Sequence, residues 1–351
     1  MNDAPELRCD PVTGRWVIIA PERARRPINL PGHAPTHRTN GERHPCPFCP
    51  GQEADTPNEV YAVRDPGTPP DAPGWRLRVV PNMYPAVRPG PPAESGSLSA
   101  PPASGGGGLF ASAPAIGTAE VLIDCAEHFD DPTKLTDVQF GEVFKAYRAR
   151  LTALAGDPAL AHVAVFKNVG AEAGASLGHS HSQIVAAPVV PELLQTELRG
   201  AEEHFARTGR CVFCDLVVGD LADGARVVAR SEHFVIVTAF APRFAYEMWV
   251  LPVAHQPRYE ALTDANAREL AALLKRALVA LDATQNTPAY NWFLHTAPLH
   301  AGAPAHYHWH LEVLPRTARP AGLEWGFGCH ITTIAPESAA AELRAALPSA
   351  E

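Results

Sequence analysis

The sequence predicts an α+β fold made of two similar modules, and a repeated order of landmarks carries this prediction. Each half contains a C-x-x-C pair, an apolar run, a single histidine, a Leu-Thr-Asp turn, a helix-like segment and a His-x-His motif. The single histidine precedes the His-x-His motif by 51 residues in the first half and by 53 in the second. This regularity favours an internal duplication over two unrelated domains.

The two helix-like segments have start signals at matching positions. Thr136 and Thr263 each precede apolar residues at helical spacing, and threonine is a good N-cap. Strand-like segments follow at residues 161–166 and 290–294. Two stretches lie outside the repeat. Residues 89–118 are rich in Pro, Gly, Ser and Ala, which predicts a flexible insertion. Residues 10–27 predict a turn, a strand over 16–20 and a basic stretch.

Composition and charge exclude several classes of function. With 351 residues and 46% hydrophobic residues, the chain has room for about two domains of ~150 residues each. The net charge of −9 argues against a nucleic-acid partner, which needs an excess of Lys and Arg. A small anionic substrate needs only a local positive cluster and remains compatible. The sequence shows no signal peptide and no run of ~20 apolar residues, so we expect a cytoplasmic protein that does not enter a membrane.

Four of the seven cysteines form the two C-x-x-C pairs. In a chain without a secretion signal such pairs favour metal binding over a disulfide, with a thioredoxin-like redox motif as the alternative. Zinc prefers four nitrogen or sulfur ligands, and each half offers two histidines to complete the set. Which histidine of each His-x-His motif binds stays open on spacing alone. The candidate ligands are Cys46, Cys49, His128 and His179 in the first half, and Cys211, Cys214, His255 and His308 in the second.

The first His-x-His motif also suggests a catalyst. Residues two apart on a strand face the same way, so His179, His181 and Gln183 would line one face. If His179 binds zinc, His181 lies beside the metal. Its neutral imidazole is a competent nucleophile toward phosphorus, and Gln183 offers an amide N–H to a phosphoryl oxygen. The alternative is three ordinary polar positions on a sheet.

The pattern G-x-S-x-x-H-x-H-x-Q at residues 174–183 resembles the active-site signature of the galactose-1-phosphate uridylyltransferase family, a branch of the histidine-triad superfamily. The resemblance implies an α+β fold of two tandem histidine-triad-like modules, each an antiparallel sheet with a long helix. It places the catalytic module at residues 1–195, with the insertion 89–118, and a second module at 196–351. It also implies that His181 carries the nucleotidyl group. The middle residue of the motif is often Pro in that family. Here it is Ser180, as in the related ADP-glucose phosphorylases.

The same resemblance assigns substrate contacts. Arg23 and Arg26 match a phosphate-contacting R-x-x-R-P motif, and Asn82 matches a nucleoside-contacting residue. Asn168 and Ser176 match phosphate contacts. Cys46, Cys49, His128 and His179 match the family's first metal site, and the second set resembles a zinc site of the phosphorylase branch. Other members use carboxylate and histidine at that second site.

Two departures bear on specificity and on the division of labour. Met83 follows Asn82 where uridylyltransferases often have Asp, which leaves the base open. In the second half Glu312 stands where the first half has Gln183, and a carboxylate would repel a phosphoryl group. We therefore assign catalysis to the first half. The segment 322–328 resembles the family's hexose-phosphate loop only loosely.

The expected reaction is a two-step exchange of UMP between UDP-glucose and galactose 1-phosphate. The alternatives are an ADP-glucose or other NDP-sugar phosphorylase, a dinucleoside polyphosphate hydrolase, and a non-catalytic zinc-stabilised nucleotide-binding protein. The expected partners are a nucleotide sugar and a sugar 1-phosphate, without nucleic acid, and a second copy of the chain in a homodimer. The expected cofactor is zinc, at one or both sites.

Overall fold

A computed structural model describes residues 5–9, 16–19, 46–90 and 112–349. Its centre is a ten-stranded sheet in the order β3-β4-β6-β8-β7-β12-β13-β11-β10-β9, with neighbouring strands antiparallel. In that order the strands are Tyr61–Arg64, Trp75–Pro81, Thr118–Ile123, His181–Ala187, His162–Val169, Tyr290–His295, His310–Pro315, Met248–Pro252, Phe234–Thr238 and Val227–Arg230. A small sheet, β2-β1-β5, joins Trp16–Ile19, Glu6–Cys9 and Ser112–Pro114.

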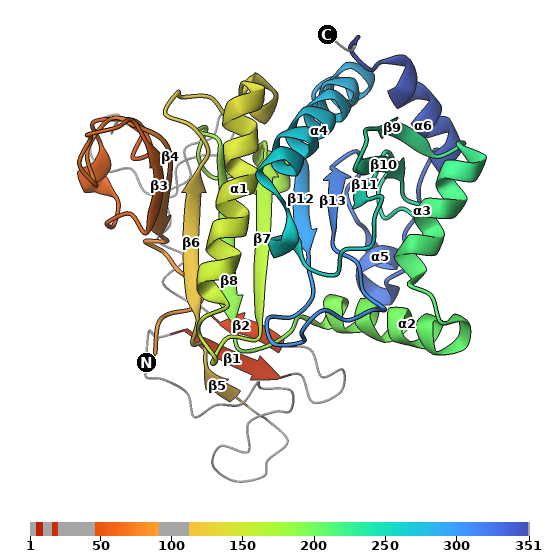
Figure 1. The fold of residues 1–351 in the computed structure, drawn as a ribbon, viewed down its shortest axis with the longest axis horizontal. Helices are drawn as coiled ribbons and strands as arrows, with labels where there is room; N and C mark the ends of the chain where they lie inside the picture. The colour runs from red at the N-terminus through yellow and green to blue at the C-terminus, as the bar shows by residue number, and fades with distance from the viewer. Residues whose placement is uncertain (1–4, 10–15, 20–45, 91–111, 350–351) are drawn as a thin grey trace.

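Two long helices, α1 (Asp137–Leu154) and α4 (Asp264–Gln285), lie side by side across the large sheet (Figure 1). The main core lies between these helices and the sheet and includes residues from both halves, such as Leu122, Phe144, Leu278 and Trp292. In the described part of the chain the remaining α-helices are α2 (Glu192–Thr208), α3 (Val212–Asp223), α5 (Gly322–Phe327) and α6 (Pro336–Ala345). The expected α+β fold of two antiparallel modules, each with a long helix, is confirmed.

The two halves are joined edge to edge within the large sheet. Strand β7 of the first half pairs with β12 of the second over five residue pairs, from Tyr290↔Val169 to Leu294↔Val165. The strand predicted over 161–166 spans 162–169 in the structure, and the strand predicted over 290–294 spans 290–295. The strand predicted over 16–20 spans 16–19. The predicted module boundary at residue 195 falls inside α2 and stays a prediction.

The predicted flexible insertion is wrong at its C-terminal end. Residues 112–114 form β5 because β1 offers them an antiparallel partner, and Thr118 already begins β6. Between them Gly117 has φ +157, and a Cβ there would lie 2.2 Å from the carbonyl oxygen of Ala186. Glycine therefore lets the chain pass close to β8. Residues 91–111 lie outside the described part of the chain.

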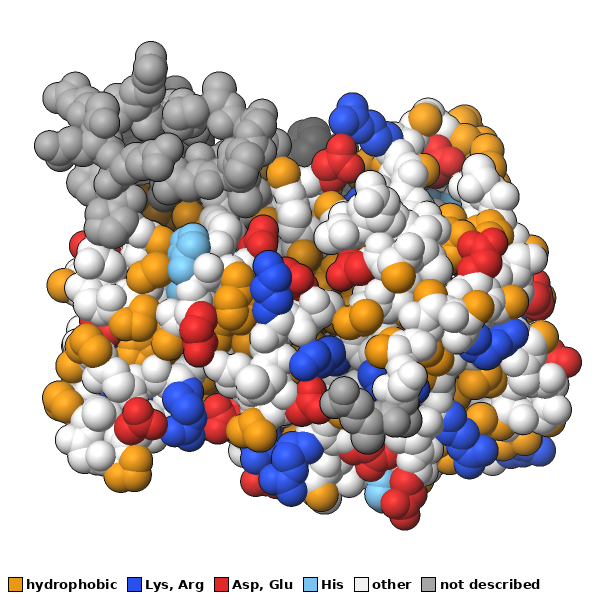
Figure 2. Space-filling view, turned by 90° about the horizontal axis from the view of Figure 1, so that it is seen from above, with side chains coloured by type: hydrophobic (Ala, Val, Ile, Leu, Met, Phe, Trp, Pro, Cys, Tyr) orange, Lys and Arg blue, Asp and Glu red, His pale blue; other side chains and the backbone are white. Residues whose placement is uncertain are grey.

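The surface agrees with the charge argument. On the face in Figure 2, acidic and basic side chains are interspersed and do not gather into a continuous basic patch. None of the helices formed by the described residues is long and apolar enough to cross a bilayer.

The start of α1 is a testable local feature. Thr136 accepts a hydrogen bond from the backbone N–H of Gln139, and the Gln139 side chain accepts one from the Thr136 N–H, which completes a capping box. Thr136→Ala should lower the free energy of unfolding by about 1 kcal/mol, because the N–H of Gln139 loses its acceptor. Urea denaturation measures this. Thr152→Ala, exposed on the same helix, should change stability by less than about 0.5 kcal/mol. Equal losses would contradict the capping role.

Candidate active site and metal-binding groups

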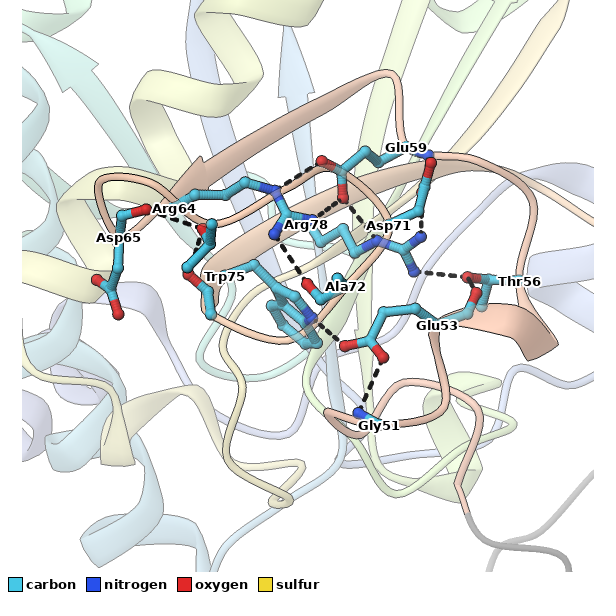
Figure 3. Close-up of polar contacts among 12 residues, drawn as sticks. Gly51, Glu53, Thr56, Glu59, Arg64, Asp65, Asp71, Ala72, Trp75 and Arg78 are labelled. Carbon is cyan, nitrogen blue, oxygen red and sulfur yellow. Dashed lines mark hydrogen bonds and ion pairs between the residues drawn. The ribbon is translucent and has the colours of Figure 1, made fainter.

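The first C-x-x-C pair lies in a tight turn that is tied to the sheet. The N–H of Cys49 donates to the carbonyl oxygen of Cys46 at 3.0 Å. A few residues on, buried Glu53 accepts hydrogen bonds from Trp75 Nε1 on β4 (2.7 Å) and from the N–H of Gly51 (2.9 Å), as Figure 3 shows. These bonds hold the cysteine-bearing loop against strand β4.

A second anchor continues from the same strand. The guanidinium of Arg78 is 1% exposed and donates to Thr56 (2.6 Å), Asp71 (2.6 Å) and Glu59 (2.9 Å), all within the segment that follows the turn (Figure 3). Two carboxylates surround one buried cation, so its charge is compensated. The position of the cysteine turn is therefore set by β4.

The four candidate ligands of the first half converge. Their ligand atoms all lie within 4.8 Å of one another. Cys49 Sγ lies 3.3 Å from His128 Nδ1 and 3.7 Å from His179 Nδ1, and Cys46 Sγ lies 3.7 Å from His179 Nδ1. A tetrahedral ion with bonds of about 2.3 Å to sulfur and 2.0–2.1 Å to nitrogen has sulfur–nitrogen edges of about 3.6 Å. The observed separations match such an ion.

The chemistry of this donor set also suits a metal. His179 Nε2 lies 2.9 Å from the carbonyl oxygen of Cys125 and must donate to it, which leaves Nδ1 free as a ligand. Burial lowers the pKa of His179 and raises the pKa of the Cys46 thiol to about 11. A neutral imidazole is ready to bind, whereas the Cys46 thiol would need a nearby cation to ionise at neutral pH.

The second half repeats this arrangement. The ligand atoms of Cys211, Cys214, His255 and His308 again lie within 4.8 Å of one another. Cys214 Sγ is 3.3 Å from His255 Nδ1 and 3.5 Å from His308 Nδ1. The rings of His255 and His308 meet edge to face, with centroids 5.5 Å apart and an interplanar angle of 85°. The corresponding values for His128 and His179 are 5.3 Å and 88°. Both groups can therefore hold a metal ion in the same way.

His181 begins strand β8, two residues after the candidate ligand His179. Its Nδ1 lies 2.7 Å from the carbonyl oxygen of His179, and a carbonyl oxygen only accepts, so Nδ1 carries the proton. The lone pair is then on Nε2. Burial lowers the pKa of His181 to about 4, which keeps the imidazole neutral at neutral pH. The ring of Phe48, from the cysteine turn, meets the His181 ring at 5.4 Å.

Asn168 and Gln183 belong to the same face of the sheet as His181. Gln183 on β8 is paired with Phe166 on β7 and with Val121 on β6. Asn168 lies two residues after Phe166 on β7, so its side chain points to the same face. The Asn168 side-chain oxygen accepts from Asn291 Nδ2 at 2.7 Å. Arg316 Nε sets this orientation because it donates to Asn291 Oδ1 at 2.6 Å. The Asn168 amide nitrogen is therefore the group presented as a donor.

For the other predicted substrate-binding residues, the described hydrogen bonds and ring contacts do not join them to His181. Ser176 is buried in the loop between β7 and β8. Asn82 follows β4, its Oδ1 accepts from the N–H of Tyr84 at 2.9 Å, and its own N–H reaches Ala119 on β6, the strand between β4 and β8. Arg23 and Arg26 lie outside the described residues.

A third group escaped sequence reasoning. Ligand atoms of Glu197, His295, His310 and Glu312 lie within 4.8 Å of one another in the second half. Glu197 accepts from His295 Nδ1 at 2.9 Å, and Arg243 forms ion pairs with Glu312 and Glu247. Glu197 looks like a solvated position on an amphipathic helix. The available signals were the correspondences of His310 with His181 and of Glu312 with Gln183.

Comparisons with known proteins identify the family of the chain. Residues 1–191 match the family described as "Galactose-1-phosphate uridyl transferase, N-terminal domain", and residues 147–350 match a "Domain of unknown function (DUF4921)". ADP-glucose phosphorylase of Arabidopsis thaliana is 35% identical over 98% of this chain and 93% of that protein. Galactose-1-phosphate uridylyltransferase of Haemophilus influenzae is 27% identical over 91% and 86%.

Solved structures give the same picture. The crystal structure of the Arabidopsis thaliana ADP-glucose phosphorylase with bound ADP-glucose has a TM-score of 0.73 at 34% identity, covering 97% of this chain and 99% of that one. A uridylyltransferase structure has a TM-score of 0.77 at 28% identity, covering 97% and 98%. The chain is thus an enzyme of the galactose-1-phosphate uridyl transferase family.

Proposed function

We propose that the enzyme exchanges UMP between UDP-glucose and galactose 1-phosphate, and that His181 carries the uridylyl group between the two half-reactions. One observation supports this most directly: the hydrogen bond from His181 Nδ1 to the carbonyl oxygen of His179 leaves the Nε2 lone pair available for attack. The relatives also include proteins named galactose-1-phosphate uridylyltransferase, a name that describes the same transfer.

The first step forms a bond between His181 Nε2 and the α-phosphorus of UDP-glucose. The bond from that phosphorus to the bridging oxygen breaks, and glucose 1-phosphate leaves with the electron pair. In the second step a phosphate oxygen of galactose 1-phosphate attacks, the phosphorus–nitrogen bond breaks and UDP-galactose forms. The acceptor is already anionic, so no strong general base is needed. Gln183 donates an amide N–H to the phosphoryl oxygens, and Asn168 supplies a second amide donor.

Zinc is the metal that we assign to the two ligand groups. Two thiolates and two imidazoles in a closed tetrahedral set are typical of structural zinc, with no position left for a substrate. Cys46, Cys49, His128 and His179 would hold one ion, and Cys211, Cys214, His255 and His308 the other. An ion held by the first group would cross-link the cysteine turn to the residues that lead into the strand that begins with His181.

An NDP-sugar phosphorylase is the second candidate, with inorganic phosphate as the acceptor in place of galactose 1-phosphate. It is favoured by Ser180 in the middle of the His-x-His motif, by exposed Met83 beside Asn82, and by the 35% identity to ADP-glucose phosphorylase. The chemistry at His181 is the same. Homodimer formation and a cytoplasmic location stay predictions.

Intact-mass measurement separates these possibilities. The enzyme is incubated with UDP-glucose or with ADP-glucose in the absence of acceptor. A UMP-sized increment with UDP-glucose alone supports uridylyl transfer, and an AMP-sized increment with ADP-glucose alone supports the phosphorylase. Adding galactose 1-phosphate or inorganic phosphate to the isolated adduct then identifies the acceptor. Steady release of mononucleotide to water would instead indicate a hydrolase.

Zinc content is the first prediction from this site. Protein purified without added zinc should contain about two zinc per chain. Cys46→Ser and Cys211→Ser should each lose about one, and thermal stability should fall, because metal binding contributes to folding. Cys329→Ser, which alters an exposed cysteine, should keep both ions. Metal analysis finding no zinc in the wild type, with Cys46→Ser fully stable, would refute the assignment.

Loss of His181 should abolish transfer. His181→Ala should slow nucleotidyl transfer by at least on the order of 10³-fold, because the group that accepts the nucleotide is gone. Zinc content should stay at the wild-type level, since the proposed ligand is His179. His181→Gly should regain transfer from a nucleotide linked to imidazole, which fits the space left by the side chain. His300→Ala, an exposed histidine, is the control. Near wild-type transfer by His181→Ala would end the two-step mechanism.

The basic stretch before the cysteine turn should bind phosphate. Arg23→Ala or Arg26→Ala should raise the KM for the nucleotide sugar or lower kcat, because a guanidinium can bind two phosphoryl oxygens at once. Arg207→Ala on the exposed side of α2 is the matched control. Steady-state kinetics with thermal melting separates binding from folding. Kinetics unchanged in both variants would leave the stretch as a solvated turn.

A further inference from the structure

A buried polar cluster lies directly behind the nucleophile strand, on the face opposite to His181. Lys167 on β7 forms an ion pair with Asp124, and its Nζ donates to Ser180 Oγ at 2.9 Å and to the carbonyl oxygen of His181 at 3.0 Å. Ser180 Oγ in turn lies 2.7 Å from Asp124 Oδ2. Lys167 and Asp124 are each 1% exposed. The ion pair therefore reaches the main chain of His181 from behind.

The internal repeat provides a comparison within the molecule. In the first half Ser182 lies between Leu122 and Lys167 on the two neighbouring strands. In the second half Leu311 lies in the same way between Val250 and Leu294. This register aligns the polar cluster with an apolar set. Asp124, Lys167, Ser180 and Ser182 correspond to Pro252, Leu294, Trp309 and Leu311.

The fold does not require the polar cluster. In the second half the corresponding Leu294, Trp309 and Leu311 are almost fully buried in the main core. A buried ion pair loses the hydration of both charges, so apolar residues of similar volume are often at least as stable. The first half keeps the costlier arrangement behind the strand that carries His181. Such local departures from the best packing are expected where function demands them.

We propose that Lys167, neutralised by Asp124, is a positioning residue for nucleotidyl transfer, which rests on the proposed role of His181. Lys167 binds the carbonyl oxygen of His181, and Ser180, which it also binds, donates its N–H to the carbonyl oxygen of Phe129 at 2.5 Å. The main chain is therefore held on both sides of the His181 Cα. The imidazole, oriented by its bond to the carbonyl of His179, keeps Nε2 aimed at the α-phosphorus while the phosphorus–nitrogen bond forms.

The test removes both charges together. Lys167→Met/Asp124→Asn deletes the bond to the His181 carbonyl, while the amide oxygen introduced at position 124 still accepts from Ser180 and no charge is left unpaired. Single-turnover formation of the nucleotidyl-enzyme is followed by intact mass with UDP-glucose and ADP-glucose as probes. The maximal rate should fall about 10- to 100-fold, because small misplacements of a reacting group cost this much. The half-saturating substrate concentration should change less than about twofold, and the melting temperature should be at or above the wild-type value.

Two further variants complete the design. Lys167→Gln/Asp124→Asn restores an N–H donor toward the His181 carbonyl and should recover most of the rate. Arg150→Met/Glu120→Gln removes a different ion pair, which joins α1 to β6 by hydrogen bonds of 2.6 and 2.9 Å. This variant should leave the rate unchanged. His181→Ala marks the background without a nucleophile.

The outcomes are distinct. A Lys167→Met/Asp124→Asn variant as fast as the wild type refutes positioning by Lys167 and leaves the proposed function standing. A loss of rate matched by lost stability, or by equal slowing in the Arg150→Met/Glu120→Gln variant, also refutes it, because any weakened core would then do the same. If the wild type forms no adduct with either probe, the proposed function fails and takes this inference with it.

Discussion

The pairing of β7 with β12 is the contact on which the site depends. It joins the two halves into one sheet, and it places Asn291 opposite Asn168 and Trp292 opposite Lys167. The second half therefore reaches into the first. Asn291 orients the Asn168 amide, and the Trp292 ring lies 5.5 Å from the Lys167 ammonium. A first module without its partner would expose this edge of the sheet and lose both contacts.

Strand β8 then serves two environments because side chains alternate along it. His181 meets Phe48 of the cysteine turn on the face that it shares with Gln183, whereas Ser182 lies on the face that is covered by helix α1. Tyr147 of α1 hydrogen-bonds Ser182 at 2.6 Å, so the helix is tied to the back of the same strand. Displacement of the strand would therefore disturb the candidate metal-binding group on one side and the buried ion pair on the other. Both sides therefore limit the movement of His181, the proposed nucleophile.

The sequence predicts those parts of the site that repeat. The helix starts at Thr136 and Thr263 and the two Cys₂His₂ groups could be found because each half supports the other's interpretation. Contacts without a repeated pattern could not be found. Lys167 and Asp124 are 43 positions apart, and each alone resembles a solvated charge. The pairing of β7 with β12 and the order in residues 112–114 depend on partner strands, which a local pattern does not identify.

The repeat also bears on the proposal that transfer takes place in the first half. Both halves place a phenylalanine of the C-x-x-C turn near the second histidine of the His-x-His motif, Phe48 at 5.4 Å from His181 and Phe213 at 4.9 Å from His310. The halves differ on the neighbouring strand. Val121, opposite Gln183 in the first half, occupies the position that Trp249, opposite Glu312, occupies in the second. Trp249 stacks on His310 at 5.0 Å and 25°, and His310 is 0% exposed, against 9% for His181. The His310 imidazole packs against both aromatic rings and has no exposed surface, so a phosphoryl group has no approach to it. The tryptophan at the position of Val121 thus accompanies the lower exposure of His310 relative to His181, the proposed nucleophile. Glu312, held by Arg243, adds a charge that an anionic substrate would avoid.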